Sequence, residues 1–346
     1  MIMKNLQSIN TFAIVGATGL VGRECLSILA EHKVQIPKLR LLASERSAGE
    51  VLQVGEANFQ VEVLDENSFD DVDVAFFAAP NDITRKYVPI AVGKGCFVID
   101  DSNCFRMDPE VPLIVPQVNG EILRNFDGPL MATPNCSTTP LALALKPLLE
   151  AYGIKRVVAS TYQSVSGAGK KANEELSRQC AGLLNGEPAE GEVFPHQIAF
   201  NLIPMIGPLL QNGYSDEEQK VSNELRKILE APDLKVSATA VRVPTFCGHG
   251  ISANVELESS FESADEIREL LENFPGLKVL DQPDSHIYPT NMQAIGSDDS
   301  FIGRIRRDPT VENGVSFFVI SDNLRKGAAL NVLECLSTLY GYRQMN

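Results

Sequence analysis

Cys136 lies in the stretch TPNCSTTP, between an apolar run that ends at Ala132 and another that begins at Leu141. The first run predicts a buried strand and the second a helix, with Ser or Thr as its cap and Pro140 at its first position. Cys136 is therefore expected at or just before a helix N-terminus, where the dipole and the free N–H groups lower the pKa of a thiol. We predict that Cys136 is a nucleophile.

The remaining cysteines are interpreted as small buried hydrophobic residues. They are Cys25, Cys96, Cys104, Cys180, Cys247 and Cys335.

A second candidate set surrounds the loop PTFCGHG at residues 244–250. Residues 235–243 and 251–258 alternate like two strands that could face each other across this loop, which would bring Arg242 and His249 together. His249 lies between two glycines and has backbone room for a ligand, so we predict that it transfers protons. The other histidines, in polar or irregular context, are interpreted as structural or surface residues: His32, His196 and His286.

Two further polar groups follow predicted regular elements. Gln163 lies near the end of a β-branched run at 154–165, just before the glycine-rich turn SGAG at 166–169, and faces either the core or a site. From Ser215 a helix is expected, opened by a capping box with Glu218. Glu217 and Lys220 share a face of it, which is either a solvated helix start or part of a cleft.

The N-terminal segment predicts a nucleotide-binding turn. A strand at Thr11–Val15 leads into GATGLVG and then into an amphipathic helix that ends near Ala30. Glycines at this spacing let the backbone turn tightly and approach a pyrophosphate, which rests on the helix N-terminus.

The next predicted strand, 39–43, ends in Ser44, Glu45, Arg46 and Ser47. An acid here would hold a ribose 2′-hydroxyl, whereas an Arg flanked by hydroxyls would hold a 2′-phosphate. Both are present, and surface loops also carry such charges without function. We interpret Arg46 with its two serines as selecting NADP.

Further apolar runs at 72–78, 96–99 and 112–115 alternate with helical stretches and complete a doubly wound parallel sheet. Arg106 follows the second of these runs and is either an anion ligand beyond the strand ends or a surface arginine.

The last 85 or so residues predict a helix at 264–273, a hairpin of 301–307 with 315–321, and a final helix after SDNLRKGAALN, with Asn323 and Gly327 at its start. We expect this helix to pack on the N-terminal sheet. The fold class is therefore α/β, with a discontinuous Rossmann-type domain (1–135 and 324–346) and an α+β catalytic and dimerisation domain (136–323) whose sheet is mostly antiparallel.

Composition restricts the partners. The chain of 346 residues has a net charge of −15, which disfavours nucleic acid and means that an anionic substrate needs a local cluster of Arg and Lys. Seven cysteines without a CxxC motif argue against a disulfide framework or a metal site and fit a reducing cytoplasm. Neither a signal peptide nor a membrane span is expected.

Together, GATGLVG, LASERSAG, PNCSTTP, TYQSVSGAG, RVPTFCGH and SDNLRKGAALN resemble the aspartate-semialdehyde dehydrogenases, in the family's order along nearly the whole chain. The resemblance implies reversible, NADP-dependent reductive dephosphorylation of L-aspartyl 4-phosphate to L-aspartate 4-semialdehyde. It also implies a homodimer and a place in lysine, threonine, methionine and diaminopimelate synthesis.

By position, the resemblance implies Cys136 as the acyl-thioester nucleophile and His249 as the general acid/base, with Gln163 in the catalytic set. Gln163 and Arg242 would bind the aspartyl moiety, Arg242 through its carboxylate, with Glu217 near the amino group. Phosphate would be held by Arg106 and Lys220. NADP would contact Gly16, Thr18, Gly19, Leu20, Val21, Ser44, Arg46, Ser47, Ser166, Gly167 and Asn323.

Two positions depart from the family pattern. Gln117 stands where the family often has an acid, and Ala78, Ala79 and Pro80 replace a glycine-bearing turn at the cofactor edge. Two alternatives remain at this point. One is another acyl-phosphate reductase, of the N-acetylglutamyl phosphate or glyceraldehyde-3-phosphate type, and the other is an NADP-binding paralogue that acts as a sensor or scaffold.

Overall fold

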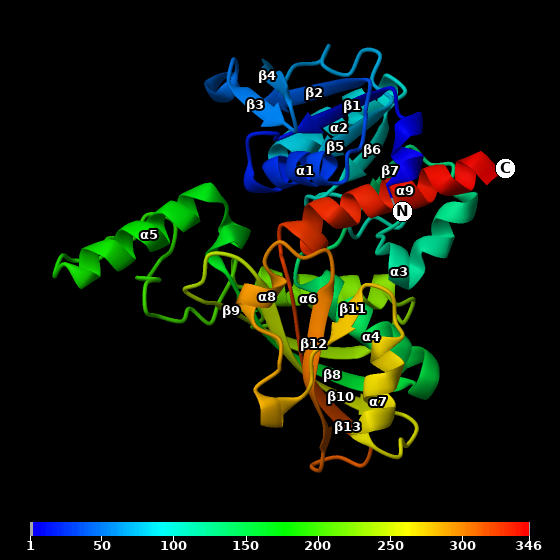
Figure 1. The fold of residues 1–346 in the computed structure, drawn as a ribbon, viewed down its shortest axis with the longest axis vertical. Coiled ribbons are helices and arrows are strands. Elements are labelled where there is room, and N and C mark those ends of the chain that lie inside the picture. The colour runs from blue at the N-terminus through cyan, green and yellow to red at the C-terminus, as the bar shows by residue number, and fades with distance from the viewer. Residues whose placement is uncertain (1–2, 346) are drawn as a thin grey trace. The chain divides into compact units, whose positions relative to one another are not determined.

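The computed structural model describes residues 3–345 and divides them into two units (Figure 1). The first unit combines the residues up to Asn135 with those from Ala328 onward, and the second is Cys136–Gly327. Among residues 3–345, no helix is both long enough and apolar enough to cross a membrane.

The first unit is built on a seven-stranded sheet in the order β3-β4-β2-β1-β5-β6-β7. All neighbours are parallel except the hairpin of β3 and β4. Its strands are β1 Thr11–Val15, β2 Lys38–Ala43, β3 Val51–Val54, β4 Ala57–Val63, β5 Val74–Phe77, β6 Phe97–Asp100 and β7 Leu130–Ala132.

Helices cover both faces of this sheet, as alternation along β1 shows. Phe12 and Ile14 belong to one buried cluster, while Ala13 and Val15 belong to another. Helices α1 and α9 contribute to the first cluster, and α2 contributes to the second. The helices are η1 Lys4–Ser8, α1 Leu20–Glu31, η2 Glu45–Ser47, α2 Asn81–Gly93, α3 Pro116–Asn119, η3 Gly120–Asn125 and α9 Leu330–Met345.

The second unit contains a six-stranded sheet in the order β11-β12-β13-β10-β8-β9. The pairs β8/β9 and β11/β12 are parallel and the other three are antiparallel. Its strands are β8 Ile154–Gln163, β9 Lys235–Arg242, β10 His249–Leu257, β11 Leu277–Val279, β12 Ser300–Asp308 and β13 Gly314–Ser321.

The helices of the second unit are α4 Thr138–Tyr152, η4 Val165–Ala168, α5 Lys170–Leu184, α6 Asp216–Ile228, α7 Ala264–Glu272, η5 Pro283–Ser285 and α8 Asn291–Ala294. The π-helix η6 Arg325–Ala329 contains the point at which the chain passes back to the first unit. Helices α4, α6 and α7 pack on the sheet. Helix α5 and the segment after it share a smaller core around Leu176 and Ile198.

The predicted fold class is confirmed, and so are the capping box of Ser215 with Glu218 and the hairpin of β12 with β13. Two local predictions were wrong. Residues 112–115 form no strand but a single bridge from Leu113 to Ala132, because Pro112 and Pro116 lack the N–H that a ladder needs.

The second error concerns helix α4, which begins at Thr138 and has Pro140 as its third residue rather than its first. Proline is tolerated there because the N–H groups of a first helical turn have no partner within the helix. The β3–β4 hairpin was not predicted at all, because its largely exposed strands give a weak alternation signal.

The turn between β1 and α1 depends on Gly16, whose φ is +87°. A Cβ at this residue would lie 2.2 Å from the carbonyl oxygen of Ala78. We predict that Gly16→Ala lowers the stability of the protein by about 3 to 5 kcal/mol, from backbone strain plus collision.

Gly95 is a matched control, because it has the same φ of +87° and nothing within 4 Å of an added Cβ. Gly95→Ala should cost only the strain, about 1 to 2 kcal/mol. The two variants are compared by thermal and urea unfolding. Equal losses would contradict the close approach of Gly16 to Ala78.

Candidate functional site

Three of the predicted site residues form one row across the sheet of the second unit. Gln163, the last residue of β8, pairs with Arg242 at the end of β9 and with His249 at the start of β10. Their side chains are buried. Because directly paired residues project from the same face of a sheet, the row brings an amide, a guanidinium and an imidazole together.

This arrangement corrects one prediction. Strands β9 and β10 do not face each other across the loop at 244–250, because β8 lies between them. Arg242 and His249 still lie close to each other, because both contact the backbone of Ser164, the residue that follows Gln163. Arg242 Nη1 donates to the carbonyl oxygen of Ser164 at 2.8 Å, and the Ser164 N–H donates to His249 Nδ1 at 3.2 Å.

Gly167 leaves room for both side chains. A Cβ on this residue would lie 2.9 Å from Arg242 Nη1 and 3.1 Å from His249 Nε2. A side chain at residue 167 would therefore require Arg242 and His249 to shift from these positions.

Burial sets the charge states in the row. The pKa of His249 falls to about 3, first because the ring is fully buried and then because Arg242 is cationic, while the Gly248 backbone opposes the shift. Burial also lowers the pKa of Arg242, against the opposing influence of Glu217 and Cys136. At neutral pH the row thus holds a cation beside a neutral imidazole.

Cys136 directly precedes Ser137, the N-cap residue of α4, as the sequence predicted. The Ser137 hydroxyl accepts from Gln163 Nε2 at 3.4 Å, so this junction lies beside the row. Gly327 passes close to the cysteine, because a Cβ there would lie 2.9 Å from Cys136 Cβ. Cys136 itself is half-buried.

Other cysteines are poorer candidates for a thiolate. Burial raises the pKa of Cys247 to about 12, with a further contribution from Asp322, and raises that of Cys96 to about 11. Within residues 3–345, no group of three or more His, Cys, Asp or Glu side chains could hold a metal ion.

Helix α6 supplies Glu217 and Lys220, which lie on one face as predicted. Lys220 Nζ is 3.5 Å from Glu217 Oε2 and 2.6 Å from Asp216 Oδ2. Glu217 is buried and acts electrostatically on Arg242, which places it near the row.

Ser166 and Asn323 meet in a buried network. Asn323 Nδ2 donates to Ser166 Oγ at 2.9 Å, and Asn323 Oδ1 accepts from the Gly248 N–H at 2.9 Å. The Ser164 hydroxyl joins both, at 3.0 Å from Ser166 Oγ and 3.1 Å from Asn323 Oδ1. The network thus connects two predicted cofactor residues to the backbone beside His249.

The glycine turn of the first unit has the shape of a pyrophosphate cradle. The N-cap residue of α1 is Gly19, which has no side chain to occupy the first N–H groups of the helix, at Leu20 and Val21. A Cβ on Gly22 would lie 2.5 Å from the Gly16 carbonyl oxygen, so helix and turn approach closely. These residues fit a dinucleotide.

The loop after β2 joins this turn. Thr18 Oγ1 donates to Ser47 Oγ at 3.4 Å, while Ser44 and Arg46 are exposed. An exposed guanidinium beside two hydroxyls remains available to a 2′-phosphate.

Arg106 is buried in the loop after β6, which excludes the alternative of a surface arginine. Its Nη2 donates to the Asp101 carbonyl oxygen at 2.7 Å. Burial raises the pKa of the neighbouring Asp100, and Arg106 is among the groups that oppose this rise.

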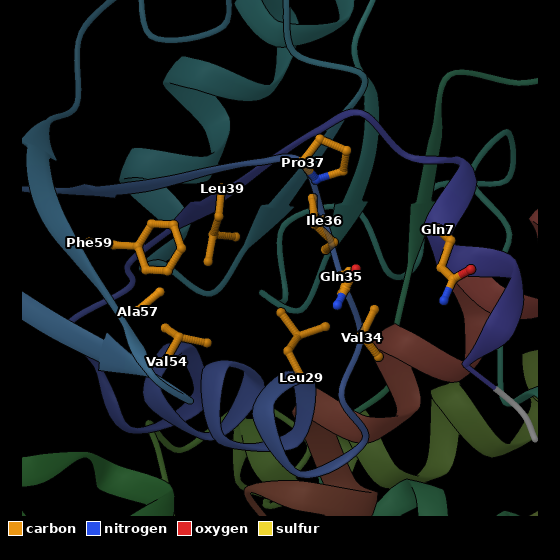
Figure 2. A pocket seen from close by; sticks show the side chains of 10 residues that line it. All are labelled: Gln7, Leu29, Val34, Gln35, Ile36, Pro37, Leu39, Val54, Ala57 and Phe59. Atoms are coloured by element: carbon orange, nitrogen blue, oxygen red, sulfur yellow. The ribbon is translucent and has the colours of Figure 1, made fainter.

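A cavity of about 580 Å³ in the first unit contains none of these residues (Figure 2). It is lined mainly by apolar side chains from α1, from the loop that precedes β2, and from the β3–β4 hairpin, among them Leu29, Ile36 and Phe59. It lies at the start of β2, whereas ligands of open α/β sheets bind beyond the carboxyl ends of the strands. We therefore do not assign the candidate site to it.

Sequence reasoning missed Ser164, Ser137 and the close approach of Gly327 to Cys136. Ser164 follows Gln163 directly and lies between that candidate residue and the glycine-rich turn at 166–169. That position was the available signal, because the hydrogen bonds to His249 and Arg242 are visible only in the structure.

Comparison with known proteins identifies the family. Residues 11–126 match the model "Semialdehyde dehydrogenase, NAD binding domain", and residues 145–326 match "Semialdehyde dehydrogenase, dimerisation domain". The aspartate-semialdehyde dehydrogenase of Aquifex aeolicus is 46% identical over 94% of this chain and 97% of its own length. The aspartate-semialdehyde dehydrogenase of Bacillus subtilis is 41% identical over 94% of this chain and 96% of its own length.

The chain belongs to the aspartate-semialdehyde dehydrogenase family. It is accordingly an oxidoreductase of amino-acid biosynthesis with a nicotinamide cofactor.

Solved structures of the family have the same fold as this chain. The Vibrio cholerae enzyme II, complexed with ASA, superposes with a TM-score of 0.92 at 40% identity, covering 96% of this chain and 98% of that one. The Candida albicans enzyme with NADP gives a TM-score of 0.74 at 25% identity, covering 97% and 99%.

One departure from the family pattern now has a physical explanation. Gln117 Nε2 donates to Glu334 Oε2 at 3.0 Å within the first unit. A carboxylate at position 117 would instead face Glu334 with like charge, so the amide suits its neighbour.

The lowered pKa of His249 predicts a pH dependence of stability. An unfolded histidine titrates near pH 6.5, and the folded one near 3, so below about pH 6.5 only the unfolded chain takes up this proton. Stability is complete above pH 6.5 and falls as the pH drops, by up to about 1.4 kcal/mol per pH unit from this group.

Urea unfolding of wild type and His249→Gln between pH 7 and 5 measures this contribution as a difference in slope. His196→Gln, which changes an exposed side chain, serves as control and should keep the wild-type slope. Parallel slopes for wild type and His249→Gln would show that the buried imidazole does not titrate as described.

Proposed function

We propose that this chain catalyses the reversible, NADP-dependent reductive dephosphorylation of L-aspartyl 4-phosphate to L-aspartate 4-semialdehyde through a thioester on Cys136. The observation that carries the proposal is the buried row of Arg242, Gln163 and His249 beside the Cys136 junction. The row offers a cation for the substrate's carboxylate, together with a polar amide and with an imidazole next to a thiol. These groups suit an amino-acid substrate that the enzyme carries as an acyl group. The family relative complexed with ASA supports the same substrate class.

Each protein group has a chemical task in this proposal. The Cys136 thiolate attacks the carbonyl carbon of the acyl phosphate, the C–O bond to phosphate breaks, and a thioester forms. The bound NADPH supplies the hydride that reduces this thioester. His249 assists as general acid/base when the resulting thiohemiacetal releases the aldehyde and Cys136 recovers its thiol.

Substrate binding is assigned to the charged groups around the row. The planar Arg242 fork suits the α-carboxylate, Gln163 holds the aspartyl moiety, and Glu217 lies near the amino group. Glu217 supports this assignment because its charge already acts on Arg242. Arg106 and Lys220 are assigned to phosphate.

The nucleotide is assigned to the glycine turn and the loop after β2. The close approaches at Gly16 and Gly22 and the glycine N-cap of α1 suit the pyrophosphate, and Arg46 with Ser44 and Ser47 suits a 2′-phosphate. Ser166, Gly167 and Asn323 complete the cofactor contacts. We assign the enzyme to the cytoplasm.

The chain is further proposed to form a homodimer through its second unit. Large apolar side chains are exposed on α5 and the segment after it: Leu184, Phe200, Leu202, Met205 and Leu209. Such a surface is typical of an interface between subunits, and the family model matched by this unit is described as a dimerisation domain.

The nucleophile is tested by Cys136→Ser, which keeps the shape of the side chain but removes the thiol. Phosphate-dependent NADP reduction with aspartate semialdehyde should fall by more than about 10⁴-fold, because the covalent route is lost, while NADP affinity stays unchanged. Cys180→Ala, at another half-buried cysteine, is the control and should stay active. Turnover by Cys136→Ser would refute the assignment, and NADP binding without turnover in wild type would favour a sensor.

Cofactor selection is tested by Arg46→Ala. Loss of a charge-assisted bond to the 2′-phosphate should lower kcat/KM for NADP about 10- to 100-fold and leave the value for NAD unchanged. Lys38→Ala removes the same charge from the opposite end of β2 and controls for long-range electrostatics. Equal effects in both variants would remove Arg46 from the 2′-phosphate site.

The dimer is tested by Phe200→Asp, at a side chain that is 66% exposed. Its φ of +59° suits Asp better than Phe, so the backbone should not resist the change. Sedimentation should show a shift from dimer to monomer, because a buried charge would oppose association. Met345→Asp, at the exposed end of α9, should remain dimeric, and a dimeric Phe200→Asp would place the interface elsewhere.

A further inference from the structure

We propose that Ser164 is a positioning residue that holds His249 as a neutral imidazole with its proton on Nε2, so that His249 begins its acid/base role as a donor through Nε2. This inference rests on the proposed function and specifies what His249 does in it.

The backbone of Ser164 defines the tautomer. Its N–H points at His249 Nδ1 over 3.2 Å, and a backbone N–H can only donate. Nδ1 must therefore accept, and a neutral imidazole that accepts at Nδ1 carries its proton on Nε2. Protonation of Nδ1 would set two N–H groups against each other.

The side chain of Ser164 reinforces the same orientation. Its hydroxyl lies 3.1 Å from His249 Nδ1, and in the tautomer set by the backbone its single proton is donated to Nδ1 rather than to Asn323 Oδ1, while Ser166 Oγ at 3.0 Å donates to Ser164 Oγ. The Gly248 N–H donates to the same Oδ1 at 2.9 Å, which fixes the direction of the Asn323 amide. The imidazole is thus held from its Nδ1 side by groups that belong to one buried network.

The opposite nitrogen is left for a ligand. His249 Nε2 is buried and has no hydrogen-bond partner among residues 3–345. It faces the space beside Gly167, and Arg242 Nη1 borders the same space, at 2.9 Å from the position of an added Cβ. A buried N–H without an acceptor costs free energy, and a substrate oxygen that enters this space would remove that cost.

The charges favour an oxygen that becomes negative. Arg242, which is assigned to the α-carboxylate, raises the cost of an imidazolium, so the neutral Nε2–H is the group that suits the carbonyl oxygen of a thioester as hydride converts it into an oxyanion. In this tautomer the Nε2–H hydrogen-bonds to the oxyanion, its proton passes to the thiohemiacetal oxygen, and the same proton returns to Nε2 when the aldehyde is released, which is the acid/base role proposed above.

Ser164 also connects the two parts of the row. Its N–H holds the imidazole, and its carbonyl oxygen accepts from Arg242 Nη1 at 2.8 Å. One residue therefore sets the spacing between the group assigned to the carboxylate and the group assigned to the reacting oxygen.

The tautomer is measured directly by NMR of the ¹⁵N-histidine-labelled full chain without ligands, with the His249 signals assigned by their loss in His249→Gln. We expect an unprotonated Nδ1 and a protonated Nε2 at neutral pH. A protonated Nδ1, either in the other tautomer or in an imidazolium, would overturn the proposal.

The variant Ser164→Ala removes the hydroxyl and keeps the N–H. It should shift the Nδ1 resonance and lower kcat about 3- to 10-fold, with KM for aspartate semialdehyde within about twofold of wild type. Ser300→Ala is the matched control, since it removes another buried hydroxyl, on β12, and should change neither. If Ser164→Ala and Ser300→Ala have the same Nδ1 resonance and the same kcat, the role of Ser164 is contradicted.

The wild-type NMR spectrum decides the tautomer independently of the variants and of enzyme activity. If Ser164→Ala fails to fold, the wild-type spectrum alone supports or overturns the tautomer. Because that spectrum needs no substrate, an inactive protein with the expected tautomer would refute the proposed function and leave the arrangement of His249 intact.

Discussion

The structure of the site depends on burying a guanidinium beside an imidazole. Two neighbouring cations in a dry environment would repel strongly, so the imidazole of His249 stays neutral while Arg242 keeps its charge. Nearby Glu217 and Cys136 favour the charged form of Arg242 and so oppose the effect of burial on its pKa. A substrate with a carboxylate and an oxygen that develops negative charge matches this uneven pair.

Close backbone approach is the second constraint, and glycines meet it in both units. In the first unit, Gly16 and Gly22 bring the turn and the helix within a distance that no Cβ would allow. In the second unit, Gly167 gives room to Arg242 and His249, and Gly327 gives room to Cys136. The same steric rule therefore shapes the proposed nucleotide cradle and the surroundings of the thiol.

The charge distribution is consistent with anionic ligands. The chain carries a net charge of −15, yet Arg106 and Arg242 are buried and held by carbonyl oxygens in defined directions. Oriented, partly desolvated cations interact with anions more strongly than surface cations do. A strongly acidic protein can thus bind acidic ligands at chosen positions.

Sequence by itself determined the elements with strong local signals. The apolar runs and the glycine turn predicted the parallel sheet of the first unit, Ser215 with Glu218 predicted the start of α6, and the position of Cys136 before α4 followed from the apolar runs on either side. These features depend on neighbours within a few residues, which is the range that periodicity and capping describe.

Only the tertiary structure decided how strands far apart in the chain are ordered. The insertion of β8 between β9 and β10 makes Gln163 the centre of the row and brings Ser164 to both Arg242 and His249. Strand order and register arise from pairing across the sheet, and each strand's own alternation is compatible with several neighbours. For this reason the sequence could name Arg242 and His249, and only the structure could show what holds them.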